Sequence, residues 1–102
     1  MWFKVLEKSP EPNAMTEISV GDNQLVLTNY DGKLYCFSNR CPHEDFQLSL
    51  GCIQKGKVKC SLHGFSFDLE NGESSEEGIE LLNLFRVKIE EEVIYVEVTP
   101  DQ

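Results

Sequence analysis

The chain has 102 residues, of which 40% are apolar and 26% charged, a composition typical of one globular domain. Eighteen acidic and nine basic residues give a formal net charge of −9 at pH 7, which opposes the phosphate contacts that dominate nucleic-acid binding. The composition therefore argues against a nucleic-acid partner, and the longest apolar run, Val93–Val96, is too short to cross a membrane.

The N-terminal segment carries charges at Lys4, Glu7 and Lys8, which interrupt the apolar stretch that a secretory signal requires. We therefore expect a cytoplasmic protein. The acidic surface suits electrostatic steering toward a basic patch on a protein partner, although acidity also simply keeps many proteins soluble. The sequence leaves the oligomeric state open.

The N-terminal part of the chain consists of short β-rich runs separated by turn residues. Alternation of apolar and polar residues and β-propensity predict strands over residues 2–8, 15–20, 24–28 and 33–37. The last two runs flank Asp31-Gly32, a pair typical of a tight hairpin turn with positive φ.

Two more hairpins are predicted further along the chain. Residues 52–54 and 57–60 flank Lys55-Gly56, which predicts a second tight turn. At the C-terminus, alternation places Phe85, Val87 and Ile89 on one face of a strand. A second strand, over residues 94–98, follows the acidic turn 90–92.

The predicted fold is all-β. Strands recur about every ten residues, and no segment has the apolar spacing of a helix. Residues 73–80 are polar and are predicted to form a loop. Small sheets that stack on one another or close into a barrel would account for this pattern.

Both histidines and two of the four cysteines lie in two short motifs, Cys41-Pro42-His43 and Cys60-Ser61-Leu62-His63. Thiolate and imidazole ligands suit zinc or an iron–sulfur centre and argue against magnesium or calcium. A common zinc finger takes two cysteines from one element and two histidines from another. Here each motif supplies one of each, an arrangement that suits a [2Fe–2S] cluster with two unlike irons.

The other two cysteines, Cys36 and Cys52, are expected to be structural. A disulfide framework would need a secreted context and would not explain the histidine beside each of the other two cysteines. Cys36 alternates onto the same face as Leu34, as a small buried residue would, and Cys52 follows Gly51 at the start of a predicted strand.

The two motifs and their spacing resemble those of Rieske-type [2Fe–2S] proteins, whose pattern is C-x-H, a spacer and C-x-x-H. Three further pairs match the family's pattern, namely His63-Gly64, Phe67-Asp68 and Asn71-Gly72, and the resemblance covers the whole chain. It implies a Rieske-like fold of small stacked antiparallel sheets, in which two loops form a cluster-binding part. We expect a single domain over residues 1–102, with the cluster-binding part at about residues 38–68.

The resemblance also implies the ligands of one [2Fe–2S] cluster per chain. Cys41 and Cys60 would bind the buried iron, and His43 and His63 would bind the exposed iron. We predict no catalytic residues.

High-potential members of the family carry an extra disulfide and two hydroxyl donors near the cluster. At the disulfide positions this chain has Phe46 and Leu62, and at the hydroxyl positions it has Phe65 and Phe67. The neighbouring Glu44 and Asp45 add negative charge. The resemblance therefore implies a low reduction potential.

By this resemblance the chain is a soluble ferredoxin similar to those of ring-hydroxylating dioxygenase systems. It would carry single electrons from a reductase to a terminal oxygenase or another acceptor, as a non-enzymatic component of a multi-component oxygenase or reductase. Two alternatives remain open: a small subunit of a nitrite-reductase-like complex, and a zinc-stabilised interaction module.

Overall fold

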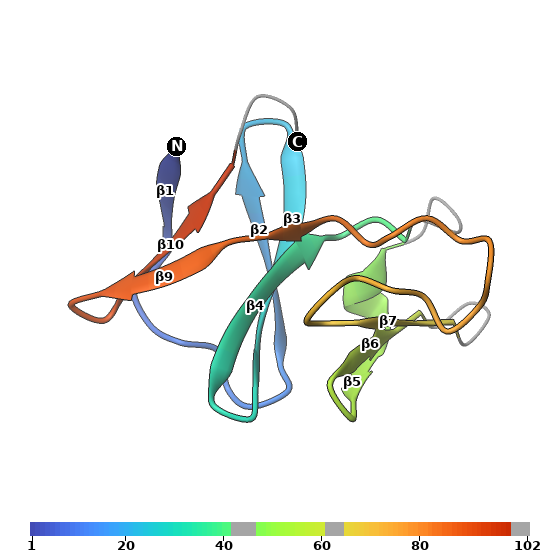
Figure 1. The fold of residues 1–102 in the computed structure, drawn as a ribbon. Coiled ribbons are helices and arrows are strands. Elements are labelled where there is room, and N and C mark those ends of the chain that lie inside the picture. The colour runs from blue at the N-terminus through green and yellow to red at the C-terminus, as the bar shows by residue number, and fades with distance from the viewer. Residues whose placement is uncertain (42–46, 61–64, 99–102) are drawn as a thin grey trace.

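The computed structural model describes residues 1–41, 47–60 and 65–98, which form three antiparallel sheets (Figure 1). The first sheet has the order β1-β10-β9, the second β2-β3-β4-β8 and the third β5-β6-β7. The elements are β1 (Trp2–Leu6), β2 (Met15–Val20), β3 (Asn23–Tyr30), β4 (Lys33–Ser38), the 3₁₀ helix η1 (Leu48–Leu50), β5 (Cys52–Gln54), β6 (Lys57–Lys59), β7 (Ser66–Asp68), β8 (Leu84–Phe85), β9 (Val87–Glu90) and β10 (Val93–Glu97). Within the described part of the chain, no helix is long and apolar enough to cross a membrane.

Tight turns with two consecutive positive φ angles form the predicted hairpins. Between β3 and β4, φ is 53° at Asp31 and 81° at Gly32, and between β5 and β6 it is 50° at Lys55 and 76° at Gly56. This pair of left-handed residues matches the twist of the two strands that it joins. The structure confirms both hairpins, which lead the chain toward Cys41 and Cys60 respectively.

The central sheet, β2-β3-β4-β8, separates two hydrophobic cores because alternate side chains of a strand point to opposite faces. Leu25 and Leu27 of β3 and Cys36 of β4 pack into a core shared with β10. Val26 of β3 and Phe37 of β4 pack into a second core shared with η1 and β5–β7. The third sheet therefore lies on one side of the central sheet and the first sheet on the other (Figure 1).

The predicted C-terminal strand is in fact two strands that belong to different sheets. Leu84–Phe85 pairs with β4 of the central sheet, whereas Val87–Glu90 pairs with β10 of the first sheet. Phe85 is buried between these sheets, but Ile89 is 53% exposed, so the continuous apolar face expected over residues 85–89 is wrong. The chain passes from one sheet to another here. Which side chains are buried therefore depends on whether the segment pairs with β4 or with β10.

Candidate metal centre

The two predicted cysteine ligands lie in the same buried core. Cys41 follows β4 and is 2% exposed, and Cys60 follows β6 and is fully buried. Both belong to the core between the central and third sheets, with apolar neighbours that include Phe37, Val58 and Phe67. The hairpin at Lys55-Gly56 thus returns the chain so that residues 19 positions apart in sequence share one apolar environment.

The two predicted histidine ligands, His43 and His63, lie outside the described residues, in segments 42–46 and 61–64. Glu44, Asp45, Phe46 and Leu62, named from the sequence as neighbours of the cluster, lie in the same two segments. Among the described residues there is no group of three or more potential metal ligands. The four-residue ligand set is therefore still a prediction, and the structure describes its two cysteines.

Backbone pairing closes the base of the second loop, which runs from Cys60 to Phe65. Lys59 pairs with Ser66 in the β6–β7 ladder, and the Cys60 N–H donates to the Phe65 carbonyl at 2.7 Å. A strand of the third sheet therefore leads directly to Cys60 and holds it in register. The far end of the loop returns through Phe65 to β7.

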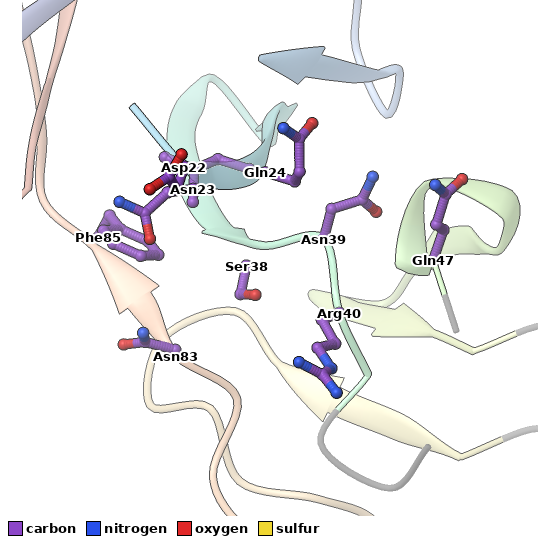
Figure 2. Close-up of a pocket in the computed structure, with 10 residues that line it drawn as sticks. Asp22, Asn23, Gln24, Ser38, Asn39, Arg40, Gln47, Asn83 and Phe85 are labelled. Atoms are coloured by element: carbon purple, nitrogen blue, oxygen red, sulfur yellow. The ribbon is translucent and has the colours of Figure 1, made fainter. Parts of the chain in front are cut away.

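The first loop has a less regular base. Arg40 and Gln47 form an isolated bridge across its two ends, and η1 begins at the next residue, Leu48. A polar surface cavity of about 340 Å³ lies beside this base, lined in part by Asn39, Arg40 and Gln47 (Figure 2). Sequence analysis did not identify Asn39 or the cavity as part of the site. The side chains that line the cavity come from segments far apart in the chain, so no local motif marks them.

The segment after β7 covers part of the third sheet. Ser74 bridges to Phe67, the Asp68 N–H donates to the Glu73 carbonyl at 2.9 Å, and the Ser75 N–H donates to the Ser66 carbonyl at 2.8 Å. Residues 73–80 contain no helix or strand, which confirms the predicted loop. This loop begins alongside the strand that follows the second ligand segment.

The environment of the two cysteines is apolar. Thr28 and Asn39 are the only polar side chains buried in the described part of the protein, and the buried residues that pack around Cys41 and Cys60 are hydrophobic. Phe67, at one of the two positions expected to carry a hydroxyl in high-potential members, is fully buried in that core, and Phe65 packs against it. Two thiolates in such a core suit the inner iron of an iron–sulfur cluster, which takes sulfur ligands and is shielded from water.

The other two cysteines differ from each other. Cys36 is 2% exposed in the opposite core, where burial raises the pKa of its thiol to about 12. Its predicted structural role agrees with this burial, because a buried thiol that does not ionise behaves as a small apolar group. Cys52 is exposed at the start of β5, so the structure does not support the structural role predicted for it. None of the four cysteines forms a disulfide, and all four are among the described residues.

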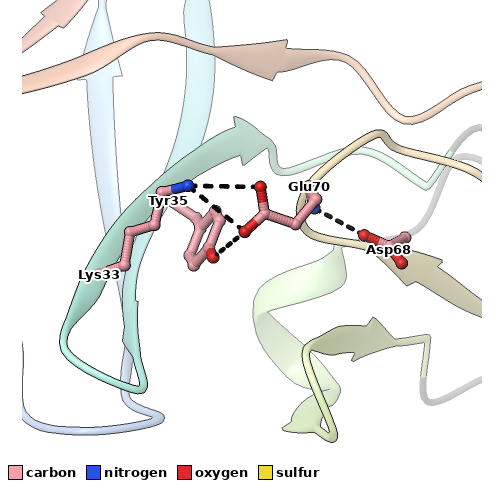
Figure 3. A network of polar contacts seen from close by, with 4 residues as sticks. All are labelled: Lys33, Tyr35, Asp68 and Glu70. Atoms are coloured by element: carbon pink, nitrogen blue, oxygen red, sulfur yellow. Dashed lines mark hydrogen bonds and ion pairs between the residues drawn. The ribbon is translucent and has the colours of Figure 1, made fainter.

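A polar network joins the central sheet to the turn after β7 (Figure 3). The Tyr35 hydroxyl donates to the Glu70 carboxylate, and Lys33 Nζ forms an ion pair with the same carboxylate at 3.3 Å. The Glu70 N–H donates to Asp68 Oδ1 at 2.7 Å. The bond to Glu70 is the main cause that raises the pKa of Tyr35 to about 12, and the bonds from Tyr35 and Lys33 lower the pKa of Glu70. This network connects β4, which leads to the first loop, with the end of β7, which follows the second loop.

Known proteins with similar sequences and folds identify the domain. The chain is 32% identical over 90 residues to human apoptosis-inducing factor 3, a match that covers 87% of this chain and 15% of that protein. It is 26% identical over 77 residues to the ferredoxin component of the alkene monooxygenase system of Xanthobacter autotrophicus, covering 74% of this chain and 63% of that protein. The chain therefore spans less than two thirds of either relative.

A solved structure has the same fold. The ferredoxin of carbazole 1,9a-dioxygenase from Nocardioides aromaticivorans IC177 superposes with a TM-score of 0.83 at 20% identity, covering 93% of this chain and 95% of that one. The Rieske [2Fe-2S] domain family matches residues 1–78, which include both cysteine and histidine motifs. This family carries a [2Fe–2S] cluster, and the two buried cysteines fit that cofactor. Because the match covers more than half of the sequence, the chain belongs to the Rieske [2Fe–2S] domain family.

Proposed function

We propose that this chain is an electron carrier that passes single electrons from a reductase to an oxygenase or another redox acceptor. The observation that carries the proposal is that Cys41 and Cys60 share one buried apolar core within a chain of the Rieske family. When bound, the [2Fe–2S] cluster supplies reversible one-electron chemistry. The protein supplies ligands, a water-excluding core and a docking surface.

The proposed ligands are Cys41 and Cys60 for the inner iron and His43 and His63 for the outer iron. The burial of both cysteines supports the first half of this assignment. The second half rests on the sequence motif, since imidazole ligands on one iron are what distinguish a Rieske centre from an all-cysteine cluster. We propose no catalytic residues and no substrate turnover by this chain alone.

We further propose a reduction potential at the low end of the Rieske range, which runs from about −150 to +300 mV. A hydrogen bond donated to a cluster sulfur stabilises the added electron and raises the potential. Phe65 and Phe67 have no hydroxyl, and the net charge of −9 also opposes the addition of an electron.

The proposed partners are redox proteins with basic docking surfaces. Two of the similar proteins are a ferredoxin component of a monooxygenase system and a ferredoxin of a dioxygenase, which supports a place in a multi-component oxygenase. A net charge of −9 favours steering toward basic surfaces and makes association sensitive to salt. The cytoplasmic location, the single domain over residues 1–102 and the cluster-binding part at about residues 38–68 stay predictions.

The family match does not favour the zinc-stabilised module. The small subunit of a nitrite-reductase-like complex remains a second arrangement for the same cluster, and tight co-purification with a large reductase subunit would indicate it.

Electron delivery to a soluble acceptor tests the proposal. Protein reduced by one electron per chain should reduce cytochrome c, a basic haem protein, in a stopped-flow experiment. The rate should fall as salt is added, because screening weakens the attraction between an acidic donor and a basic acceptor. A protein that takes up no electron, or that holds one without passing it on at low salt, would contradict the proposed function.

A further inference from the structure

Asn39 is an almost fully buried polar residue at the start of the first loop. The residue is 5% exposed and lies two positions before Cys41, just after the end of β4. Figure 2 shows Asn39 and Arg40 where the chain leaves β4, and Gln47 beyond the loop. A buried amide is destabilising unless its donor and acceptor both form hydrogen bonds. The partners of Asn39 therefore show what this buried residue holds together.

Every polar group of Asn39 has a partner. Its backbone N–H donates to the Gln24 carbonyl at 2.9 Å, and its carbonyl accepts from the Leu48 N–H at 3.3 Å. Its side-chain Oδ1 accepts from the Ser49 N–H at 2.8 Å, and Nδ2 donates to Glu17 Oε2 at 3.0 Å. The Ser49 hydroxyl donates to the same Glu17 oxygen at 3.1 Å. We call Glu17, Asn39 and Ser49 the polar clamp.

The polar clamp joins the two ends of the first loop. Asn39 precedes the loop, whereas Leu48 and Ser49 belong to η1, which follows it. Glu17 attaches both ends to β2 of the central sheet. In the second loop, the β6–β7 ladder and the bond from Cys60 to Phe65 join the two ends through the backbone. Among the described residues, an isolated bridge between Arg40 and Gln47 and the bond from the Leu48 N–H to the Asn39 carbonyl join the ends of the first loop, and the polar clamp adds side-chain bonds between them.

The chemistry of the clamp requires an amide at position 39. Asparagine offers an acceptor to the Ser49 N–H and a donor to the Glu17 carboxylate from one planar group. Aspartate would offer acceptors only and would place a second negative charge against Glu17. Leucine has a similar shape and would leave the Ser49 N–H and the Glu17 oxygen without this partner.

We propose that Asn39 is a positioning residue for the [2Fe–2S] cluster. Through Glu17 and Ser49 it holds the end of β4 against η1, and so fixes Cys41 and both ends of the loop that carries His43. This inference rests on the proposed function, because it assigns a role relative to the cluster. Residues that orient ligands from outside the first coordination shell commonly change metal affinity by about 10–100-fold when they are replaced.

The test compares variants by cluster lifetime, by the EPR spectrum of the reduced cluster and by thermal unfolding. In the presence of a chelator, Asn39→Asp should shorten the half-life of the visible cluster absorption by about tenfold or more. It should also shift the EPR spectrum, because the ligands of one loop move. Glu17→Gln retains an oxygen acceptor for Asn39 and Ser49 and should behave as the wild type, whereas Glu17→Ala should resemble Asn39→Asp.

Thr28→Val is the matched control for lost stability. Thr28, on β3 of the central sheet, is the other buried polar residue of the described chain, and its hydroxyl donates to the Ala14 carbonyl at 2.7 Å. This variant should lower the unfolding temperature without changing the cluster half-life or the EPR spectrum. If Asn39→Asp fails to fold, Glu17→Ala, a change at an exposed side chain, carries the same test.

Two outcomes would contradict the inference, and they are distinguishable. In the first, the wild type holds a cluster, and the clamp variants lose it no faster than a Thr28→Val protein whose unfolding temperature has fallen by the same amount. Asn39 would then be only a structural residue. If the wild type binds no [2Fe–2S] cluster, the proposed function fails, and the positioning role fails with it.

Discussion

The backbone of Gly51 lies directly against the carbonyl group of Lys59. A Cβ atom placed on Gly51 would be 1.8 Å from the Lys59 oxygen, a distance that no side chain can adopt. Gly51 ends η1, where its N–H donates to the Leu48 carbonyl at 2.9 Å, and Lys59 immediately precedes Cys60. The element that follows the first loop is therefore held in close contact with the strand that leads to the second.

Gly51→Ala should destabilise the protein and disturb the cluster. The obstructing atom belongs to the backbone, so the methyl group must push η1 and β6 apart, at a cost of about 1–3 kcal/mol in free energy of unfolding. Denaturant unfolding and the visible spectrum would measure both effects. Gly21→Ala is the control, because a methyl group there meets nothing within 4 Å and is disfavoured only by a φ of +60°. An unchanged spectrum in Gly51→Ala would show that this contact does not set the geometry of the loops.

Phe67→Tyr should raise the reduction potential. Phe67 is fully buried in the core that holds Cys41 and Cys60, so a new hydroxyl can act as a donor near the cluster. A net hydrogen bond of about 0.5–1.5 kcal/mol corresponds to about 20–60 mV for one electron. Voltammetry measures the shift. Phe85→Tyr adds the same group to the opposite core and should leave the potential unchanged. A fall in potential, or no change, on Phe67→Tyr would contradict the explanation of the low potential.

The Tyr35–Glu70 hydrogen bond should stabilise the fold in a defined pH window. Because folding raises the pKa of Tyr35 from 10.0 to about 12, its contribution is complete below pH 10 and is lost as the pH rises from 10 through 12. Because the pKa of Glu70 is lowered from 4.5, its contribution is present above pH 4.5 and is lost as the pH falls further.

Tyr35→Phe tests this window. The difference in unfolding temperature between the wild type and Tyr35→Phe should be constant from about pH 6 to pH 9 and should shrink above pH 10, as Tyr35 ionises. Tyr95→Phe removes a hydroxyl from β10, which belongs to a different sheet from Tyr35, and serves as the control. A difference that stays the same up to pH 12 would show that the hydrogen bond to Glu70 does not stabilise the fold.

Cys36 should be unreactive in the folded protein. Burial raises the pKa of its thiol to about 12, so at pH 8 almost none of it is the reactive thiolate, and reagents cannot reach it. Alkylation with iodoacetamide followed by mass spectrometry should modify the exposed Cys52 in the native protein and Cys36 only after denaturation. Cys52 in the same sample is the internal control. Equal labelling of the two residues would contradict the structural role of Cys36.

Features encoded locally were predictable from the sequence. The turns at Asp31-Gly32 and Lys55-Gly56 depend on neighbouring residues, and both hairpins form as predicted. The change of sheet after Phe85 depends on which distant strand pairs with each side of it, so alternation alone predicted one strand instead of two. The helix η1, with three residues, is too short to produce a periodic pattern.

In the candidate site, too, the local features were predictable from the sequence and the long-range contacts were not. The ligand motifs are compact, so Cys41 and Cys60 could be identified from spacing, and the structure places both in one core. The polar clamp could not be identified from the sequence, because Glu17 and Asn39 are 22 positions apart and come together only when the sheet forms. His43 and His63 lie outside the described residues, and their assignment still rests on the sequence.

Pulsed EPR spectroscopy of the chemically reduced protein tests the central claim most directly. If Cys41, Cys60, His43 and His63 bind the cluster, the pulsed EPR spectrum should show couplings to two histidine nitrogens. Chemical analysis of the same sample should find two irons and two sulfides per chain. His43→Cys and His63→Cys should each remove one of these couplings. A colourless protein that contains zinc, or a cluster that shows no coupling to histidine nitrogen, would contradict the assignment of this chain as a Rieske electron carrier.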